Sequence, residues 1–125
     1  MTELKLELFE DTFTIHRFSP SAKIPDEVFG EAFFNIVKTE EELSIVCRNS
    51  LTLNSESCHQ AWSCIKVSGP LELNTTGILA KLSKVLAGER ISIFAISTYD
   101  TDYVFIPSKK TNAAVSALKD AGYQF

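Results

Sequence analysis

The sequence predicts an α+β fold of two ferredoxin-like βαββαβ units in tandem, the first degenerate, with antiparallel sheets and helices on one face. Two observations carry this prediction: the strand-helix-strand-strand-helix-strand order of residues 62–125, and a weak internal repeat of that half in residues 10–60. The 125 residues are 45% hydrophobic and 22% charged, so they can form one core or two small lobes that share one. We therefore expect a degenerate lobe over residues 1–61 and a complete unit over residues 62–125.

The second half begins with a strand and a helix. Residues 62–68, WSCIKVS, alternate as a strand does, and the following GPLELNTTG contains turn and capping residues. Apolar side chains at helical spacing then predict a helix that ends at Gly88. The apolar face of this helix comprises Ile78, Leu79, Leu82, Val85 and Leu86.

A hairpin and a second helix complete this unit. Residues 91–97 and 103–107 are short runs rich in β-branched and aromatic residues, which predicts two strands joined by a turn. A helical pattern follows from Ser108 to Gly122, and the YQF of 123–125 can add a last strand. The hairpin strands are apolar on both faces, and helices cover only one. The other face needs the first lobe, a second subunit or both, and we favour a homodimer.

The first half looks like a reduced copy of the second. Residues 14–20, TIHRFSP, resemble 64–70, CIKVSGP, and residues 34–46 resemble 94–106, with Phe34 over Phe94 and Ile36 over Ile96. Only residues 21–32 stand where the second copy has its first helix, and the polar residues 49–61 look irregular. We therefore expect the first lobe to have lost most of one helix and all of the other.

Composition excludes several classes of protein. The net charge of −4 and the scattered basic residues argue against a nucleic-acid partner. No apolar stretch approaches the roughly 20 residues of a membrane span, and the N-terminus lacks the apolar block of a signal peptide. Three cysteines without a close-spaced pair indicate reduced thiols and no disulfide. We expect a cytoplasmic protein with no membrane partner.

Polar residues gather at two places that the topology brings to one edge. The predicted helix start offers free backbone N–H groups, which stabilise a carboxylate. The turn between the hairpin strands offers Asp100 and Asp102, which can accept hydrogen bonds from an ammonium or guanidinium group. An amino acid carries both charges, although such residues also serve as simple caps and turn formers. The residues at the helix start are Asn74, Thr75, Thr76 and Gly77.

The run VSGPLELNTTGILAKLSKVLAGERISIFAISTYDTDYVFIP resembles the ACT domain. It is similar to tandem-ACT proteins related to the CASTOR-type arginine sensors and to the regulatory ACT units of aspartate kinases. The resemblance implies two ACT units that bind an amino acid without catalysis and signal to a regulated protein partner. It implies ligand contacts from Thr98, Tyr99, Thr101 and Asp102, with Asp102 as the charge partner, and, less directly, from residues 74–77.

Other kinds of site are weaker interpretations. Cys58, His59 and Cys64 lack the paired short spacing of zinc ligands, and a Cys-His nucleophile pair has no orienting partner at recognisable spacing. We predict no metal, no cofactor and no enzymatic activity. The alternative function is a protein interaction domain whose pocket is empty and whose apolar sheet face docks a partner.

Overall fold

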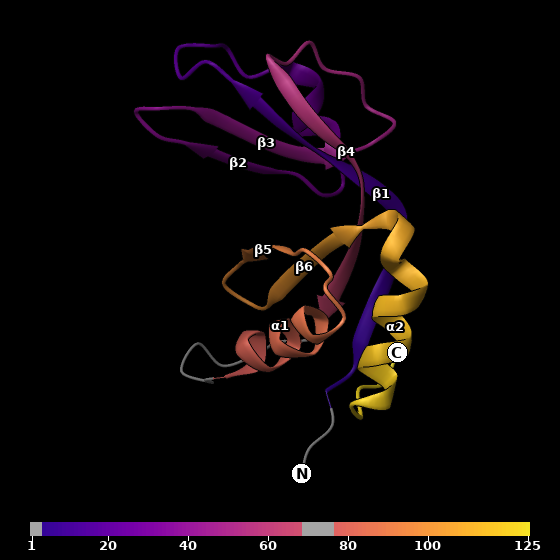
Figure 1. Ribbon diagram of the computed structural model, residues 1–125. Helices are drawn as coiled ribbons and strands as arrows, with labels where there is room; N and C mark the ends of the chain where they lie inside the picture. The colour runs from indigo at the N-terminus through magenta and orange to yellow at the C-terminus, as the bar shows by residue number, and fades with distance from the viewer. Residues whose placement is uncertain (1–3, 69–76) are drawn as a thin grey trace. The chain divides into compact units, whose positions relative to one another are not determined.

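The computed structural model describes residues 4–68 and 77–125 and confirms the α+β class (Figure 1). The chain forms two compact units. We call residues Met1–Glu10 with Ser63–Phe125 the helical unit, and residues Asp11–Trp62 the strand unit. The strand order is β2-β3-β1-β4-β6-β5. Strands β1 (Leu6–Phe18) and β4 (Ser57–Val67) each run from one unit into the other.

The helical unit confirms the predicted helix, hairpin and second helix. It contains α1 (Ile78–Gly88), β5 (Phe94–Ser97), β6 (Asp102–Pro107), the short 3-10 helix η2 (Ser108–Lys110) and α2 (Thr111–Asp120). Both helices pack on one face of the strands, because alternate strand residues and one stripe of each helix are apolar. The buried residues of this core are Leu6, Ile65, Val67, Leu82, Leu86, Ile91, Val104, Ile106, Ala114 and Leu118.

Three boundaries in the helical unit differ from the sequence prediction. The first hairpin strand begins at Phe94 and not at residue 91, because the Ile91 N–H donates to the Leu86 carbonyl at the end of α1. Residues 123–125 form a single bridge, Lys5 to Gln124, in place of a strand. Strand β1 begins at Leu6, before the repeat that the sequence showed over residues 10–60. The first residues of β1 belong to the helical unit.

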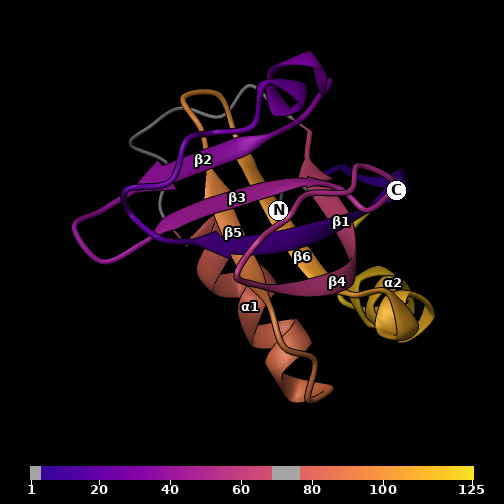
Figure 2. The ribbon, with the colours of Figure 1, turned by 90° about the horizontal axis from the view of Figure 1, so that it is seen from above.

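The strand unit has little helix, as predicted. It contains the 3-10 helix η1 (Asp26–Gly30), β2 (Asn35–Lys38) and β3 (Leu43–Arg48), and Figure 2 shows β2, β3, β1 and β4 in that order. Its core comprises Phe18, Val28, Leu43, Ile45 and Cys47. Residues 57–61, expected to be irregular, belong to β4. Their side chains are exposed, so they lack the apolar alternation that marks a half-buried strand.

The two hairpins have the same register, but it differs by one residue from the sequence alignment. Lys38 pairs with Leu43 and Ser97 pairs with Asp102, and each pair closes a turn of four residues. Asn35, and not Phe34, therefore corresponds to Phe94, and Val37 corresponds to Ile96. A shift of one residue moves every side chain to the other face of a strand. The predicted alignment was therefore wrong, because it matched side chains that lie on opposite faces of the two hairpins.

Candidate functional site

The turn between β5 and β6 carries the predicted ligand residues and is held by its own hydrogen bonds. The Thr98 N–H donates to the Thr101 carbonyl at 2.8 Å, and the Thr101 N–H donates to Thr98 Oγ1 at 3.3 Å. A threonine at the first turn position favours this closure because its hydroxyl bonds nearby backbone groups. The turn is therefore shaped before any ligand arrives.

Thr101 ties this turn to β4. Its side chain is buried, and its Oγ1 donates to the Val67 carbonyl at 2.5 Å. The hydroxyl proton is thus used within the chain. Since the bond joins residues 34 apart in sequence, no local pattern could have indicated it.

The remaining turn side chains point to solvent or to a neighbouring strand residue. Tyr99 is 82% exposed, and Asp100 is exposed as well. Asp102 is half-buried, and its Oδ1 accepts a hydrogen bond from Ser97 Oγ at 2.5 Å. Ser97 was not among the predicted site residues, although it stands directly before the turn. Its hydroxyl fixes the carboxylate that the resemblance identifies as the charge partner.

The start of α1 is the second part of the predicted site. Gly77 is the N-cap residue, with φ +81°, and no side chain in residues 4–68 or 77–125 caps the helix. That φ favours glycine, and a Cβ there would meet no atom of the described residues within 4 Å. The start of α1 and the β5–β6 turn lie toward the same end of the helical unit (Figures 1 and 2). Asn74, Thr75 and Thr76 lie outside the described residues.

Each unit also has a cavity that the sequence did not indicate. The one in the helical unit measures about 580 Å³, and the one in the strand unit about 220 Å³. Of the predicted ligand residues, Gly77, Thr98, Tyr99, Thr101 and Asp102 are described, and none of these lines either cavity. The first is lined by Lys5, Leu6, Glu7, Leu8, Ser68, Val115, Lys119 and Phe125. The second is lined by Ile15, His16, Arg17, Glu42, Ser44, Ser57, Cys58 and His59.

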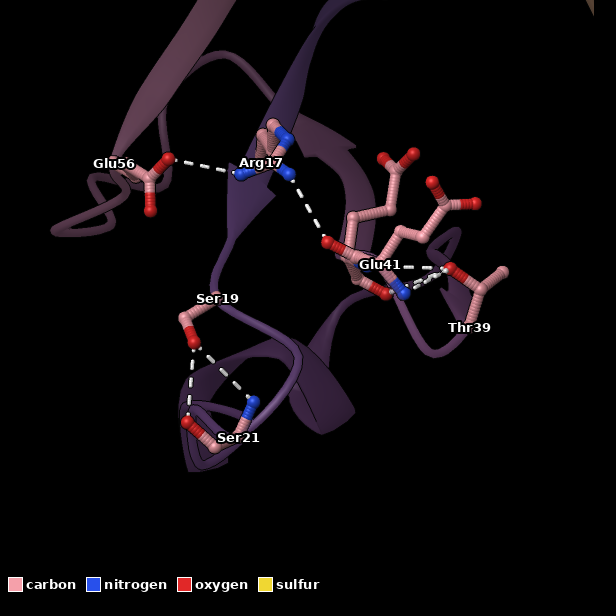
Figure 3. A network of polar contacts seen from close by, with 7 residues as sticks. Arg17, Ser19, Ser21, Thr39, Glu41 and Glu56 are labelled. Atoms are coloured by element: carbon pink, nitrogen blue, oxygen red, sulfur yellow. Dashed lines mark hydrogen bonds and ion pairs between the residues drawn. The ribbon is translucent and has the colours of Figure 1, made fainter.

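The corresponding turn of the strand unit repeats the threonine closure (Figure 3). The Thr39 N–H donates to the Glu42 carbonyl at 2.9 Å, and Thr39 Oγ1 accepts from the N–H groups of Glu41 and Glu42. Arg17 donates to the Glu41 carbonyl and forms an ion pair with Glu56 at 2.9 Å. Arg17 thus fixes one side of this acidic turn through the backbone, while the side chains of Glu40 and Glu41 are exposed and that of Glu42 is half-buried.

The two buried cysteines, Cys47 and Cys64, are poorly suited to catalysis or metal binding. All three cysteines of the chain are free, and burial raises the pKa of Cys47 to about 11 and that of Cys64 to about 12. Both thiols are therefore protonated at neutral pH, whereas the thiolate is the nucleophile and the metal ligand. In residues 4–68 and 77–125, no group of three His, Cys, Asp or Glu side chains comes together in an arrangement that could hold a metal ion.

Neither helix of the described chain has the length and apolar character that crossing a bilayer requires.

The fold is of the α+β class, with a six-stranded sheet and two α-helices, and the helical unit carries a polar turn closed by its own hydrogen bonds. A family model of the ACT domain matches residues 57–120, about half of the chain, and a second model, described as an N-terminal domain, matches residues 11–51. The chain belongs to the ACT-domain family, which confirms the resemblance seen in the sequence.

One relative with a similar sequence is an arginine sensor. The chain is 28% identical over 102 residues to subunit 1 of the cytosolic arginine sensor for mTORC1 of Mus musculus. The aligned residues make up 79% of this chain and 30% of that protein. It therefore spans less than a third of this relative.

Two solved structures resemble the whole chain. A protein of Agrobacterium tumefaciens is 31% identical with a TM-score of 0.90, covering 99% of this chain and 92% of that one. The regulatory subunit of aspartate kinase from Thermus flavus is 15% identical with a TM-score of 0.68, and the match covers 96% of this chain and 99% of that one. At this identity the similarity is one of fold alone.

Proposed function

We propose that this ACT-domain protein is a non-catalytic regulatory module that binds an amino acid or a similar small metabolite at the β5–β6 turn and the start of α1. The observation that carries the proposal is the turn itself. Its backbone is closed by Thr98 and Thr101, while Tyr99 and Asp100 remain exposed beside it. A preorganised turn with free polar side chains loses little entropy on binding.

The chemistry of the two parts suits a zwitterion. The first N–H groups of a helix, together with its dipole, stabilise a carboxylate, and no described side chain caps α1 and competes for them. Asp100 and Asp102 can receive an ammonium or guanidinium group. The similarity to an arginine sensor supports a ligand of this class.

The strand unit fits this proposal as a reduced ACT unit. It has the same hairpin register and the same threonine closure, and η1 stands where the helical unit has α1. We also expect the protein to work in the cytoplasm and to act on a regulated protein. For such regulation the ligand must favour one arrangement of the protein over another, since equal affinity for both shifts nothing.

A second candidate function is an interaction domain with an empty pocket. The observation that favours it is that the hydroxyl of Thr101 and the carboxylate of Asp102 already have partners within the chain. Groups that are satisfied in the free protein gain less from a ligand, because each new hydrogen bond replaces an existing one.

A ligand screen with two matched variants tests the proposal. We expect one or more of the twenty amino acids, at millimolar concentration, to raise the melting temperature of the full chain. Asp102→Asn should abolish that rise, because it removes the charge but keeps an oxygen to accept from Ser97. Ser97→Ala should retain most of the rise, because it removes this bond but keeps the charge. A flat screen would favour the interaction domain.

A further inference from the structure

The larger of the two cavities lies in the helical unit, between the first part of β1 and α2 (Figure 1). It measures about 580 Å³, which is within the range of about 300–1,000 Å³ that small-molecule sites occupy. All of its lining residues belong to the helical unit, and the described residues of the proposed amino-acid site are not among them. The proposed amino-acid site therefore does not account for this cavity.

The cavity has an apolar wall on the side of the helices. Leu6 is buried in the core with Leu118 of α2, and Leu8 lies two residues further along the same face of β1. Val115 and Phe125 also line the cavity and are half-buried, whereas Leu8 is 39% exposed. A ligand with an apolar portion would cover these side chains and gain the free energy of removing them from water.

One cation stands on the same side as this apolar wall. Lys119 follows Val115 by one turn of α2, so both side chains project from the same side of the helix. The Lys119 Nζ is 6.0 Å from the centroid of the Phe125 ring, which is part of the wall. In residues 4–68 and 77–125, no carboxylate forms an ion pair with Lys119. Its ammonium is therefore available to an anionic group of a ligand.

Lys5 and Glu7, the other two charged residues that line the cavity, belong to the opposite face of the sheet. Both alternate along the strand with Leu6 and Leu8, so their side chains start on the face away from the helices. Their opposite charges offset each other there, and the lining keeps one net positive charge, that of Lys119. A ligand with a cationic group thus finds no carboxylate among the lining residues on the side of the helices.

The backbone of β1 adds a second hydrogen-bond donor. The Leu6 N–H donates to the Gln124 carbonyl on the outer side of β1, and alternation directs the Leu8 N–H to that same side. In the described chain, the C-terminal segment is bridged to β1 at Lys5 alone, and β3 pairs with β1 only from Phe13 onward. The Leu8 N–H therefore has no strand opposite it among the described residues.

We propose that this cavity binds a small apolar monocarboxylate, an acid with an alkyl or aryl tail and no cationic group. The tail lies against Leu8, Val115 and Phe125, and the carboxylate accepts hydrogen bonds from the Lys119 ammonium and the Leu8 N–H. A neutral or cationic molecule of the same shape lacks the charged contact. This site is separate from the amino-acid site at the β5–β6 turn and does not depend on it.

A titration of the full chain, followed by its amide chemical shifts, tests this site with octanoate as the probe. We expect saturable shifts at the amides of Leu8, Val115 and Lys119. Acetate, which has the carboxylate without the tail, should cause no such shifts at the same concentrations. 1-Octanol and protonated octylamine, which keep the tail and lack the negative charge, should bind more weakly than octanoate. Absence of saturable shifts with octanoate, or equal affinity for octanoate and 1-octanol, would overturn the proposal.

Lysine variants test the charged contact. Lys119→Gln should raise the dissociation constant of octanoate about threefold, because it removes the charge that the carboxylate meets at an exposed site. Lys119→Arg keeps the charge and should bind nearly as the wild type does. Lys109→Gln is the matched control, since Lys109 is exposed on η2 and does not line the cavity, and it should leave the affinity unchanged. Equal weakening by Lys119→Gln and Lys109→Gln would overturn the site. The amide spectrum of each variant checks that it folds.

Discussion

His16 is an ionisable side chain buried in the core of the strand unit. Its Nδ1 lies 2.8 Å from Ser55 Oγ, and its ring lies 6.1 Å from the Phe18 ring, centroid to centroid, with the two planes inclined at 36°. Its Nε2 has no hydrogen-bond partner in the described structure. Burial lowers the pKa of His16 below its ordinary value, because the charged form loses its hydration. The folded protein therefore holds this imidazole neutral under conditions in which the unfolded chain protonates it.

The free energy of unfolding should depend on pH through this group. Below the ordinary histidine pKa of about 6.5, the unfolded chain binds a proton that the folded chain does not, so stability falls as the pH falls through that value. We expect urea unfolding at pH 7.5 and 5.5 to show this fall. His16→Phe should reduce it, and exposed His59→Gln should leave it unchanged. An undiminished fall in His16→Phe would show that other groups cause it.

At the scale of the elements, a buried hydroxyl fixes the ligand turn to β4. Thr101→Val removes the donor and leaves the Val67 carbonyl without it, which costs about 1–3 kcal/mol of unfolding free energy. Thr101→Ser keeps the hydroxyl and should lose much less. Urea unfolding measures both, and a serine variant as unstable as the valine variant would assign the effect to packing of the methyl group.

The elements show what the sequence could and could not predict. Helix α1 and the β5–β6 turn were predictable, because apolar spacing and a polar run between apolar runs are local patterns. The alignment of the hairpins was wrong by one residue, because similarity of Phe34 to Phe94 set it, whereas the closing pairs Lys38–Leu43 and Ser97–Asp102 fix the true register. The partner of Thr101 depends on the fold and has no local signal.

At the scale of the molecule, the helical unit is completed by the first part of β1, which comes from a distant part of the chain, whereas the strand unit is one continuous segment. Leu6 is buried in the core of the helical unit with residues of β4, β6 and both helices. The sequence around it, LKLELFE, has the alternation of a half-buried strand, and reading it as a strand would have shown this contribution. The internal repeat seen in the sequence began only at residue 10, so it did not include this strand. The division into ACT units at residues 1–61 and 62–125 therefore remains a prediction.

Leu6 should therefore control the stability of an ACT domain whose matched residues begin at 57. Leu6→Ala in the full chain should lower the free energy of unfolding by about 2–5 kcal/mol, because it leaves a cavity in the core. Leu8→Ala, on the same strand but exposed, should cost far less. For the same reason, residues 57–125 alone should give the poorly dispersed amide spectrum of an unfolded chain. A well-dispersed spectrum from that fragment would mean that the helical unit folds without β1.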